Sequence, residues 1–147
     1  MSFGDIYNQK ILEYAGNLPD LPRLDAPDAS ARRHSRVCGS TIEIDLKMED
    51  GTVSAYGHEV ATCALGQTSA SIVAHNIVGA TADELRLVRT QMQAMLKADG
   101  PPPIGRFEDL KYLEPVKDFP QRHASVMLVF EAICDALDQI ELQAKSA

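Results

Sequence analysis

The fold is decided by the stretch TIEIDLKM, residues 41–48, which alternates strictly between polar and apolar side chains. One set consists of Ile42, Ile44, Leu46 and Met48, and the other of Thr41, Glu43, Asp45 and Lys47. Successive side chains of a strand point to opposite faces, so this pattern predicts a strand with one face on a core and one facing water. The following EDGT, residues 49–52, supplies an Asp-Gly turn, and a second strand is expected from Thr52 to about Ala61.

Helical patterns surround this hairpin. On its N-terminal side a short helix is predicted at 5–15, followed by an extended, proline-containing segment at 17–31. On its C-terminal side one helix is predicted at 64–78, and a second begins after the capping box of Thr81 and Glu84. A third is predicted from about Val126 to Ile140, and an irregular segment is expected between the second and the third. The chain is therefore expected to form one α+β domain over residues 1–147, a small antiparallel sheet of about three strands packed against several helices.

Composition excludes several classes of function. The net charge of −7 disfavours a nucleic-acid partner, because phosphate binding needs a basic surface. Arg32, Arg33 and Arg36 form a local basic cluster, either a solvated loop or a patch facing an anionic partner. The first residues have no signal-peptide pattern, and the longest apolar run, Val126–Phe130, is too short to cross a membrane. A cytoplasmic protein without a membrane partner is expected.

The chain has three cysteines, Cys38, Cys63 and Cys134, an odd number that favours reduced thiols over a disulfide framework. A two-residue turn pairs Glu49 with Thr52, and carrying that register along both strands brings Cys38 opposite Cys63. Directly opposed residues have Cβ atoms roughly 5 Å apart, close enough to share a metal. A bulge near Gly57 could shift the register by one residue without separating the two thiols far.

The positions of the cysteines suggest different roles. Cys63 falls where the second strand meets a helix, and a helix N-terminus stabilises a thiolate. Gly39 leaves backbone amides accessible beside Cys38. Both thiols could instead be small buried side chains that only pack, since free cysteine often behaves as a small hydrophobe. Cys134 lies on the apolar side of the last helix, where an inert, buried thiol is expected.

Three segments resemble the NifU-type (IscU-like) iron–sulfur cluster assembly scaffolds, most closely the Suf-type branch. Cys38-Gly39-Ser40 before an alternating strand resembles the first cysteine motif, and Cys63 with the Ser/Ala-rich residues 67–71 resembles the second. Phe119 to Ser125 and the helix after it resemble the third motif. The similarity extends from Phe3 to about Ile140. It implies that Cys38 and Cys63 are two ligands of the cluster.

Two residues depart from the family pattern. Ser40 stands where the family has an aspartate, and Ser125 where it has the third cysteine. A hydroxyl is a poor substitute for a thiolate at iron or zinc, which favour soft ligands. His123, Ser125 and Ser40 are weaker candidates for completing the shell, with His123 offering an imidazole, and His34 and His58 are further histidines to consider. His75 lies mid-helix and far from the thiols, and is discounted.

The resemblance implies a scaffold, not an enzyme, that binds iron or a [2Fe–2S] cluster, receives sulfur from a cysteine desulfurase and passes clusters to apoproteins. Two thiolates from each of two subunits could complete the shell of a homodimer. Three alternatives remain: a SufE-like sulfur acceptor that carries a persulfide, a degenerate member with a binding or regulatory role, and a zinc protein. No phosphate-binding loop, nucleophile elbow or zinc-protease motif supports a kinase or hydrolase.

Overall fold

A computed structural model describes residues 8–36 and 39–146. The elements in chain order are α1 (Gln9–Gly16), β1 (Ala29–Ser35), β2 (Ser40–Glu49), β3 (Thr52–Ala61), α2 (Ala64–Asn76), α3 (Ala82–Lys97), the 3-10 helices η2 (Gly105–Asp118) and η3 (Pro120–Arg122), and α4 (His123–Ser146). The three strands form one antiparallel sheet in the order β1-β2-β3. The expected α+β architecture with a three-stranded sheet is confirmed.

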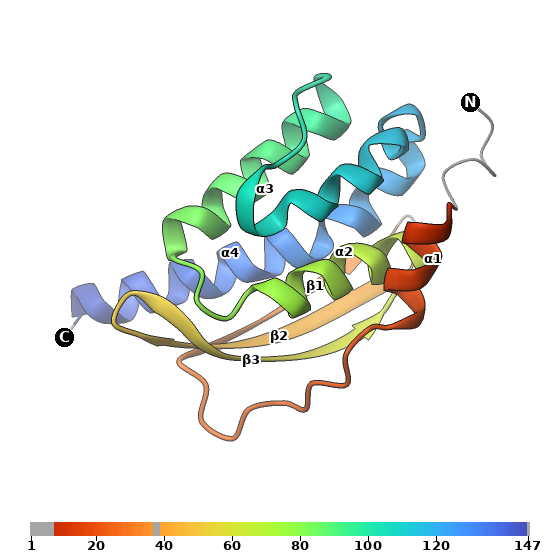
Figure 1. Ribbon diagram of the computed structural model, residues 1–147. Coiled ribbons are helices and arrows are strands. Elements are labelled where there is room, and N and C mark those ends of the chain that lie inside the picture. Colours follow the sequence, from red (N-terminus) through yellow and green to blue (C-terminus); the bar gives the residue numbers. More distant parts are fainter. Residues whose placement is uncertain (1–7, 37–38, 147) are drawn as a thin grey trace.

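All the helices lie on one side of the sheet (Figure 1). Helices α2 and α4 pack nearest to it, and α3 and η2 form a further layer above them, while α1 packs against α2. The buried apolar side chains of the sheet and of every α-helix form one cluster. The opposite face of the sheet is crossed by residues 17–28, which we call the strap (Figure 1). No helix in the described part of the chain has the length and apolar character needed to cross a membrane.

The β2–β3 hairpin forms as its sequence predicts. Asp50 and Gly51 both have positive φ, 53° and 81°, as a two-residue turn between twisted strands requires. Glu49 pairs with Thr52, but the register shifts by one residue between Lys47 and Met48, so that Thr41 pairs with Ala61. The expected bulge therefore exists, although it lies near the turn and not at Gly57. Gly57 serves another purpose, because a Cβ there would lie 2.5 Å from the Pro22 carbonyl oxygen of the strap.

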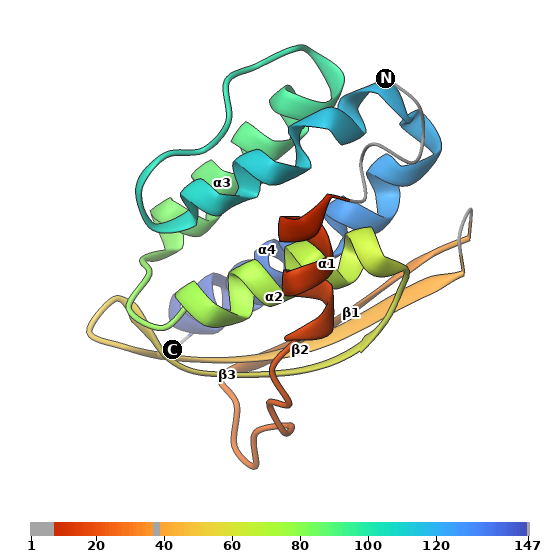
Figure 2. The same cartoon turned by 45° about the vertical axis from the view of Figure 1, so that its right-hand side comes forward.

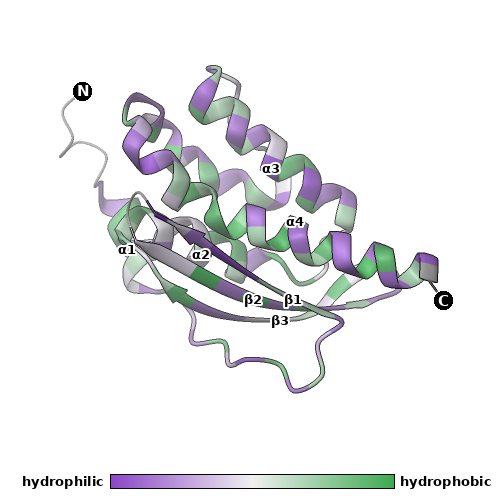
Figure 3. Ribbon diagram, turned by 180° about the vertical axis from the view of Figure 1, so that it is seen from behind, coloured by the Kyte–Doolittle hydropathy of each residue, from purple (hydrophilic) through white to green (hydrophobic). Residues whose placement is uncertain are grey.

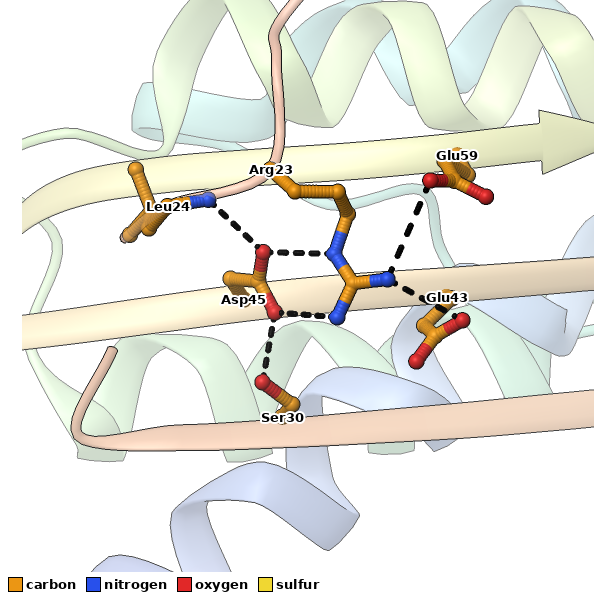
Figure 4. A network of polar contacts seen from close by, with 6 residues as sticks. All are labelled: Arg23, Leu24, Ser30, Glu43, Asp45 and Glu59. Atoms are coloured by element: carbon orange, nitrogen blue, oxygen red, sulfur yellow. Dashed lines mark hydrogen bonds and ion pairs between the residues drawn. The ribbon is translucent and has the colours of Figure 1, made fainter. Parts of the chain in front are cut away.

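The outer face of β2 is not uniformly exposed to water, which corrects the prediction for Asp45. Its side chain is fully buried beneath the strap and accepts two hydrogen bonds from the Arg23 guanidinium, at 2.6 and 2.9 Å (Figure 4). The backbone N–H of Leu24 and the hydroxyl of Ser30 donate to the same carboxylate. Arg23 also lies 3.1 Å from Glu43. The contact with Arg23, which is distant in sequence, buries the Asp45 side chain, and the alternation of residues 41–48 alone does not predict it.

Two segments differ from the predicted elements. Residues 29–35 form the edge strand β1 and are not part of an extended loop, and residues 105–118 form a 3-10 helix where an irregular segment was expected. The strand is hard to recognise because only its small residues Ala29, Ala31 and Ser35 are buried, between exposed basic side chains. The capping box at Thr81 is present as predicted, with both of its reciprocal hydrogen bonds to Glu84.

Candidate functional site

The thiol of Cys63 lies where the sheet meets the helices. Cys63 follows β3 and is the N-cap residue of α2, with an extended backbone at φ −69° and ψ 172°. Its side chain is partly buried and forms no disulfide. The position agrees with the prediction that this cysteine stands at the start of a helix.

Ser125 faces this thiol from the first turn of α4. The Cys63 Sγ lies 3.4 Å from the Ser125 Oγ, and Ser125 is almost completely buried, at 1% exposure. The Ser125 hydroxyl in turn donates to the carbonyl oxygen of Arg122 at 3.0 Å. Two residues that are 62 positions apart in sequence are thus brought into direct contact.

The close approach of α2 to α4 makes this contact possible (Figure 2). A Cβ at Gly66 would lie 3.0 Å from the Ser125 carbonyl oxygen and 2.2 Å from the Thr62 Oγ1. Three residues further along α2, the Ser69 hydroxyl donates to the Val126 carbonyl oxygen at 2.9 Å. Gly66 leaves room for the two helix backbones to approach, and Ser69 links them by a hydrogen bond. Together they fix the position of α2 relative to α4, and with it the position of the Cys63 thiol. Gly66 was not expected to matter from the sequence, and Ser69 was noted only as part of the Ser/Ala-rich residues 67–71, although the i, i+3 spacing places both on one helix face.

The surroundings of Cys63 favour its thiolate. Burial raises the pKa of the Cys63 thiol, but the Ser125 hydroxyl, the backbone amides of Gly66 and Leu65, and the Thr62 hydroxyl together lower that pKa below its ordinary value. Cys134 behaves in the opposite way: burial raises the pKa of its thiol in spite of the nearby Arg89 and Arg86. Cys134 is only 8% exposed, which agrees with the expected buried, inert thiol.

The end of the β1–β2 hairpin reaches the same place. Ser35 pairs with Ser40, and Ser40, 2% exposed, accepts a hydrogen bond from the Thr62 Oγ1 at 2.8 Å. Cys38, the other expected ligand, lies outside the described residues. The link between Ser40 and Thr62 nevertheless joins the residue two positions after Cys38 to the residue just before Cys63.

The histidines considered as further ligands either hydrogen-bond to backbone carbonyl oxygens or lie away from the thiol. The Nε2 of His123 lies 3.0 and 3.2 Å from the carbonyl oxygens of Val116 and Lys117, so this nitrogen carries a hydrogen and donates to them. The Nε2 of His58 is bound in the same way to the Pro19 carbonyl oxygen at 2.8 Å. His34 is exposed on β1, and His75, as expected, lies away from the thiol, beside Tyr14. Within residues 8–36 and 39–146, no group of three or more His, Cys, Asp and Glu side chains could hold a metal ion.

The chemistry of the described site is therefore that of one accessible, acidic thiol surrounded by hydroxyl groups. Cys63 can act as a soft ligand or as a nucleophile. Ser125, Ser40 and Thr62 supply hydroxyls that donate or accept hydrogen bonds, and the structure adds Thr62 to the residues expected from the sequence.

Comparisons with known proteins agree on one family. No family model matches the sequence. The chain is 26% identical over 140 residues to the iron–sulfur cluster assembly scaffold protein IscU of Thermotoga maritima, covering 95% of this chain and 98% of that protein. Its structure resembles that of a crystallised iron–sulfur cluster scaffold for the SUF system from Fervidobacterium islandicum AW-1, with a TM-score of 0.83, 17% identity, and coverage of 92% and 99%, a likeness of fold.

A second solved structure gives a stronger match in sequence. The crystal structure of a nitrogen-fixing NifU-like protein (N-terminal) from Brucella abortus is 55% identical to this chain and superposes with a TM-score of 0.91, covering 93% of this chain and 95% of that one. Identity at this level over nearly the full length is shared by members of one family. The chain belongs to the NifU/IscU-like family of iron–sulfur cluster assembly scaffold proteins.

Proposed function

We propose that this protein is a scaffold on which an iron–sulfur cluster is assembled, with the thiolates of Cys38 and Cys63 as its ligands. The observation that carries the proposal is the acidic thiol of Cys63 at the N-terminus of α2, 3.4 Å from the Ser125 hydroxyl, in a chain of this family. Thiolates are the ligands that hold iron–sulfur clusters in proteins. The cluster is the cargo of the reaction, assembled on the protein and then passed on.

The hydrogen bond between Ser40 and Thr62 supports Cys38 as the partner of Cys63. It joins Ser40, which follows Cys38 by two residues in the chain, to Thr62, which directly precedes Cys63. A loop tied so near to Cys63 can present a second sulfur to the same ion. Ser40 and Ser125 are oxygen donors in the positions that correspond to the family's aspartate and third cysteine, and they would be weak ligands at best.

Because one chain offers two thiols at this site, Cys134 being buried elsewhere, the proposal takes the remaining strong ligands from a second chain. Two chains that each contribute Cys38 and Cys63 would supply the four thiolates of a [2Fe–2S] cluster. In this proposal a cysteine desulfurase provides the sulfur as a persulfide, and electrons from iron(II) and from a thiol reductant, which becomes a disulfide, convert it to sulfide. The iron and sulfide form the cluster on the scaffold, and apoproteins receive it. Zinc is the alternative metal for the same thiols.

Anaerobic reconstitution tests the proposal. The protein is incubated with iron(II), cysteine, a cysteine desulfurase and an excess of a thiol reductant, and is then desalted. It is analysed by visible absorption, iron and sulfide content, and native mass spectrometry. We expect one cluster for each pair of chains, lost in Cys38→Ser and in Cys63→Ser but retained in Cys134→Ser, since Cys134 is buried away from the site. Firm binding of zinc without iron or sulfide would contradict the proposal. A persulfide on Cys63 without retained iron would instead favour a sulfur acceptor.

A further inference from the structure

The side chain of His123 makes an unusual contact next to the thiol site. His123 is the first residue of α4 and is 7% exposed. Its Nε2 lies 3.0 Å from the carbonyl oxygen of Val116 and 3.2 Å from that of Lys117. Carbonyl oxygens accept and cannot donate, so the Nε2 carries a hydrogen and donates to both. While this contact lasts, the same nitrogen has no lone pair to offer a metal.

The two carbonyl oxygens belong to the last turn of η2. The last carbonyl groups of a helix have no partner within the helix, and a side chain that donates to them fixes the helix end. Helix η2 packs against α2 and α3. Its buried side chains are part of the common core: Phe107, Leu110, Leu113 and Val116. His123 therefore ties the start of α4 to a segment that α2 and α3 hold in place.

The first turn of α4 has no side-chain cap from the residue before it. That residue is Arg122, whose side chain carries donors and cannot accept from the first N–H groups of the helix. Figure 3 shows α4 lying over the sheet, with hydrophobic colour recurring along its length. The buried residues from Val126 to Phe130 hold the helix as a whole, but the ends of helices fray where nothing holds the terminal turn. His123 supplies a contact that holds this turn.

The contacts of His123 complete a ring through the site. Ser125, two residues further along α4, lies 3.4 Å from the Cys63 Sγ. Cys63 is the N-cap residue of α2, α2 packs against η2, and the end of η2 accepts hydrogen bonds from His123. Breaking the link at His123 would open this ring two residues from Ser125. The hydroxyl that faces the thiol would then lose a support.

We propose that His123 is a positioning residue of the cluster site. Its Nε2–H ties the end of η2 to the first turn of α4 and thereby holds the Ser125 hydroxyl against the Cys63 thiol. The imidazole acts through Ser125 and does not bind the cluster. The importance of this role rests on the proposed scaffold function, but the arrangement belongs to the metal-free chain and is tested there.

The test is the infrared S–H stretching band of Cys63 in the metal-free protein at mildly acidic pH. Cys38→Ser and Cys134→Ser are combined so that one thiol remains. The hydrogen bond to Ser125 lowers the frequency of the band, so Ser125→Ala should move it to higher wavenumber. His123→Leu, which has no donor, should move it in the same direction. His123→Gln, whose amide N–H can donate to the same carbonyl oxygens, should leave it near its unaltered position.

Further measurements make the test specific. The double variant of Ser125→Ala and His123→Leu should show the shift of Ser125→Ala alone, because His123 acts through Ser125. His58→Leu is the matched control, since the buried His58 also donates from its Nε2 to a backbone carbonyl oxygen, that of Pro19 at 2.8 Å. It should leave the band in place. Nitrogen NMR of the unaltered chain should find the hydrogen of the His123 ring on Nε2, and this measurement decides if His123→Leu does not fold.

Several results would overturn the proposal. They are a band that His123→Leu leaves in place or moves to lower wavenumber, an equal shift in His58→Leu, a larger shift in the double variant than in Ser125→Ala, and a ring hydrogen on Nδ1 alone. Cluster reconstitution adds one more. His123→Gln should retain more cluster than His123→Leu, and equal loss in both would make the imidazole a ligand.

The two proposals can fail separately. The infrared and nitrogen measurements contain no metal, so their failure leaves the scaffold proposal standing. If the unaltered chain assembles no cluster, the scaffold proposal fails, while the position of Ser125 and its dependence on His123 are still decided by the metal-free measurements.

Discussion

The sulfur of Cys63 lies 3.4 Å from the hydroxyl oxygen of Ser125, across the contact between the first turns of α2 and α4. Either group can donate in this pair. The thiol S–H donates to the Ser125 oxygen, while the Ser125 hydroxyl donates to the Arg122 carbonyl oxygen. When the thiol ionises, the hydroxyl can turn and donate to the sulfur instead. The Ser125 hydroxyl thus stabilises the thiolate next to it.

Ser125→Ala should therefore raise the pKa of the Cys63 thiol, because the thiolate loses a hydrogen-bond donor. Alkylation of Cys63 at neutral pH, followed by peptide mass spectrometry, should slow roughly three- to tenfold. Ser71→Ala is the matched control, since Ser71 is a buried serine of α2 that hydrogen-bonds to the Asn17 carbonyl oxygen instead. An unchanged alkylation profile in Ser125→Ala would mean that the hydroxyl does not act on the thiol.

Ser125→Cys should strengthen retention of cluster or metal, because a soft thiolate would replace a hydroxyl at contact distance from Cys63. Adding Ser40→Asp should strengthen it further by providing an oxygen ligand. The measurement is the iron, sulfide and zinc content after desalting against a weak chelator, with Ser71→Cys as the control for an added thiol. If Ser125→Cys folds but retains no more metal than the unaltered chain, Ser125 does not stand in a ligand position.

Gly66→Ala should destabilise the fold by about 1–3 kcal/mol, because the added methyl group overpacks the contact between α2 and α4. Urea unfolding measures the loss. Thr62→Ala in the same chain should recover part of it, since the methyl group would lie closest to the Thr62 side chain. Gly16→Ala is the control, with no atom within 4 Å of the added carbon. Additive losses in the double variant would show that Thr62 is not the obstacle.

Asp45→Asn should lower the free energy of unfolding by about 2 kcal/mol at neutral pH, because a buried carboxylate bound by Arg23 loses its charge. Burial alone would raise the pKa of Asp45, but hydrogen bonds from Arg23, Ser30 and Leu24 hold that pKa below the ordinary value. Glu43→Gln, on a partly exposed carboxylate beside the same arginine, should cost less than about 1 kcal/mol.

The pH dependence of this pair follows from the direction of the shift. A carboxylate with a lowered pKa in the folded state contributes its full stability above the ordinary aspartate pKa of about 4, and loses it as the pH falls toward the lower folded value. The difference in unfolding free energy between the unaltered chain and Asp45→Asn should therefore stay constant above that range and shrink below it. Urea unfolding at a series of pH values measures this, and a constant difference down to pH 3 would contradict the role of Asp45.

Local patterns predicted the elements that local chemistry determines. The alternation of residues 41–48, the Asp-Gly turn and the capping box at Thr81 each specify their own structure within a few residues, and all three are found. The burial of Asp45 could not be predicted in this way, because its partner Arg23 is 22 residues away in a segment without regular structure. The strand β1 escaped recognition because three exposed polar residues, 32–34, interrupt its buried small ones.

The site was predicted in part. The place of Cys63 at a helix start follows from the change of period after β3, and the importance of Ser125 came from the family resemblance, not from any pattern in the residues. His123 hydrogen-bonds to two backbone carbonyl oxygens of η2, and the pattern of side chains in the sequence does not predict such acceptors. The pairing of Cys38 with Cys63 remains a prediction.

The contact between Cys63 and Ser125 also has a consequence for biosynthesis. The hairpin of β2 and β3 joins neighbours in sequence and can form as soon as residue 61 has left the ribosome. Ser125, the partner of the thiol, is made 62 residues after Cys63. Asp135, the ion-pair partner of Arg33 in β1, is made 102 residues after Arg33. Contacts over such separations form slowly and only once the intervening chain exists. A nascent chain therefore exposes the Cys63 thiol before it has the helix that covers it, and the contact with Ser125 can form only once the start of α4 has been made.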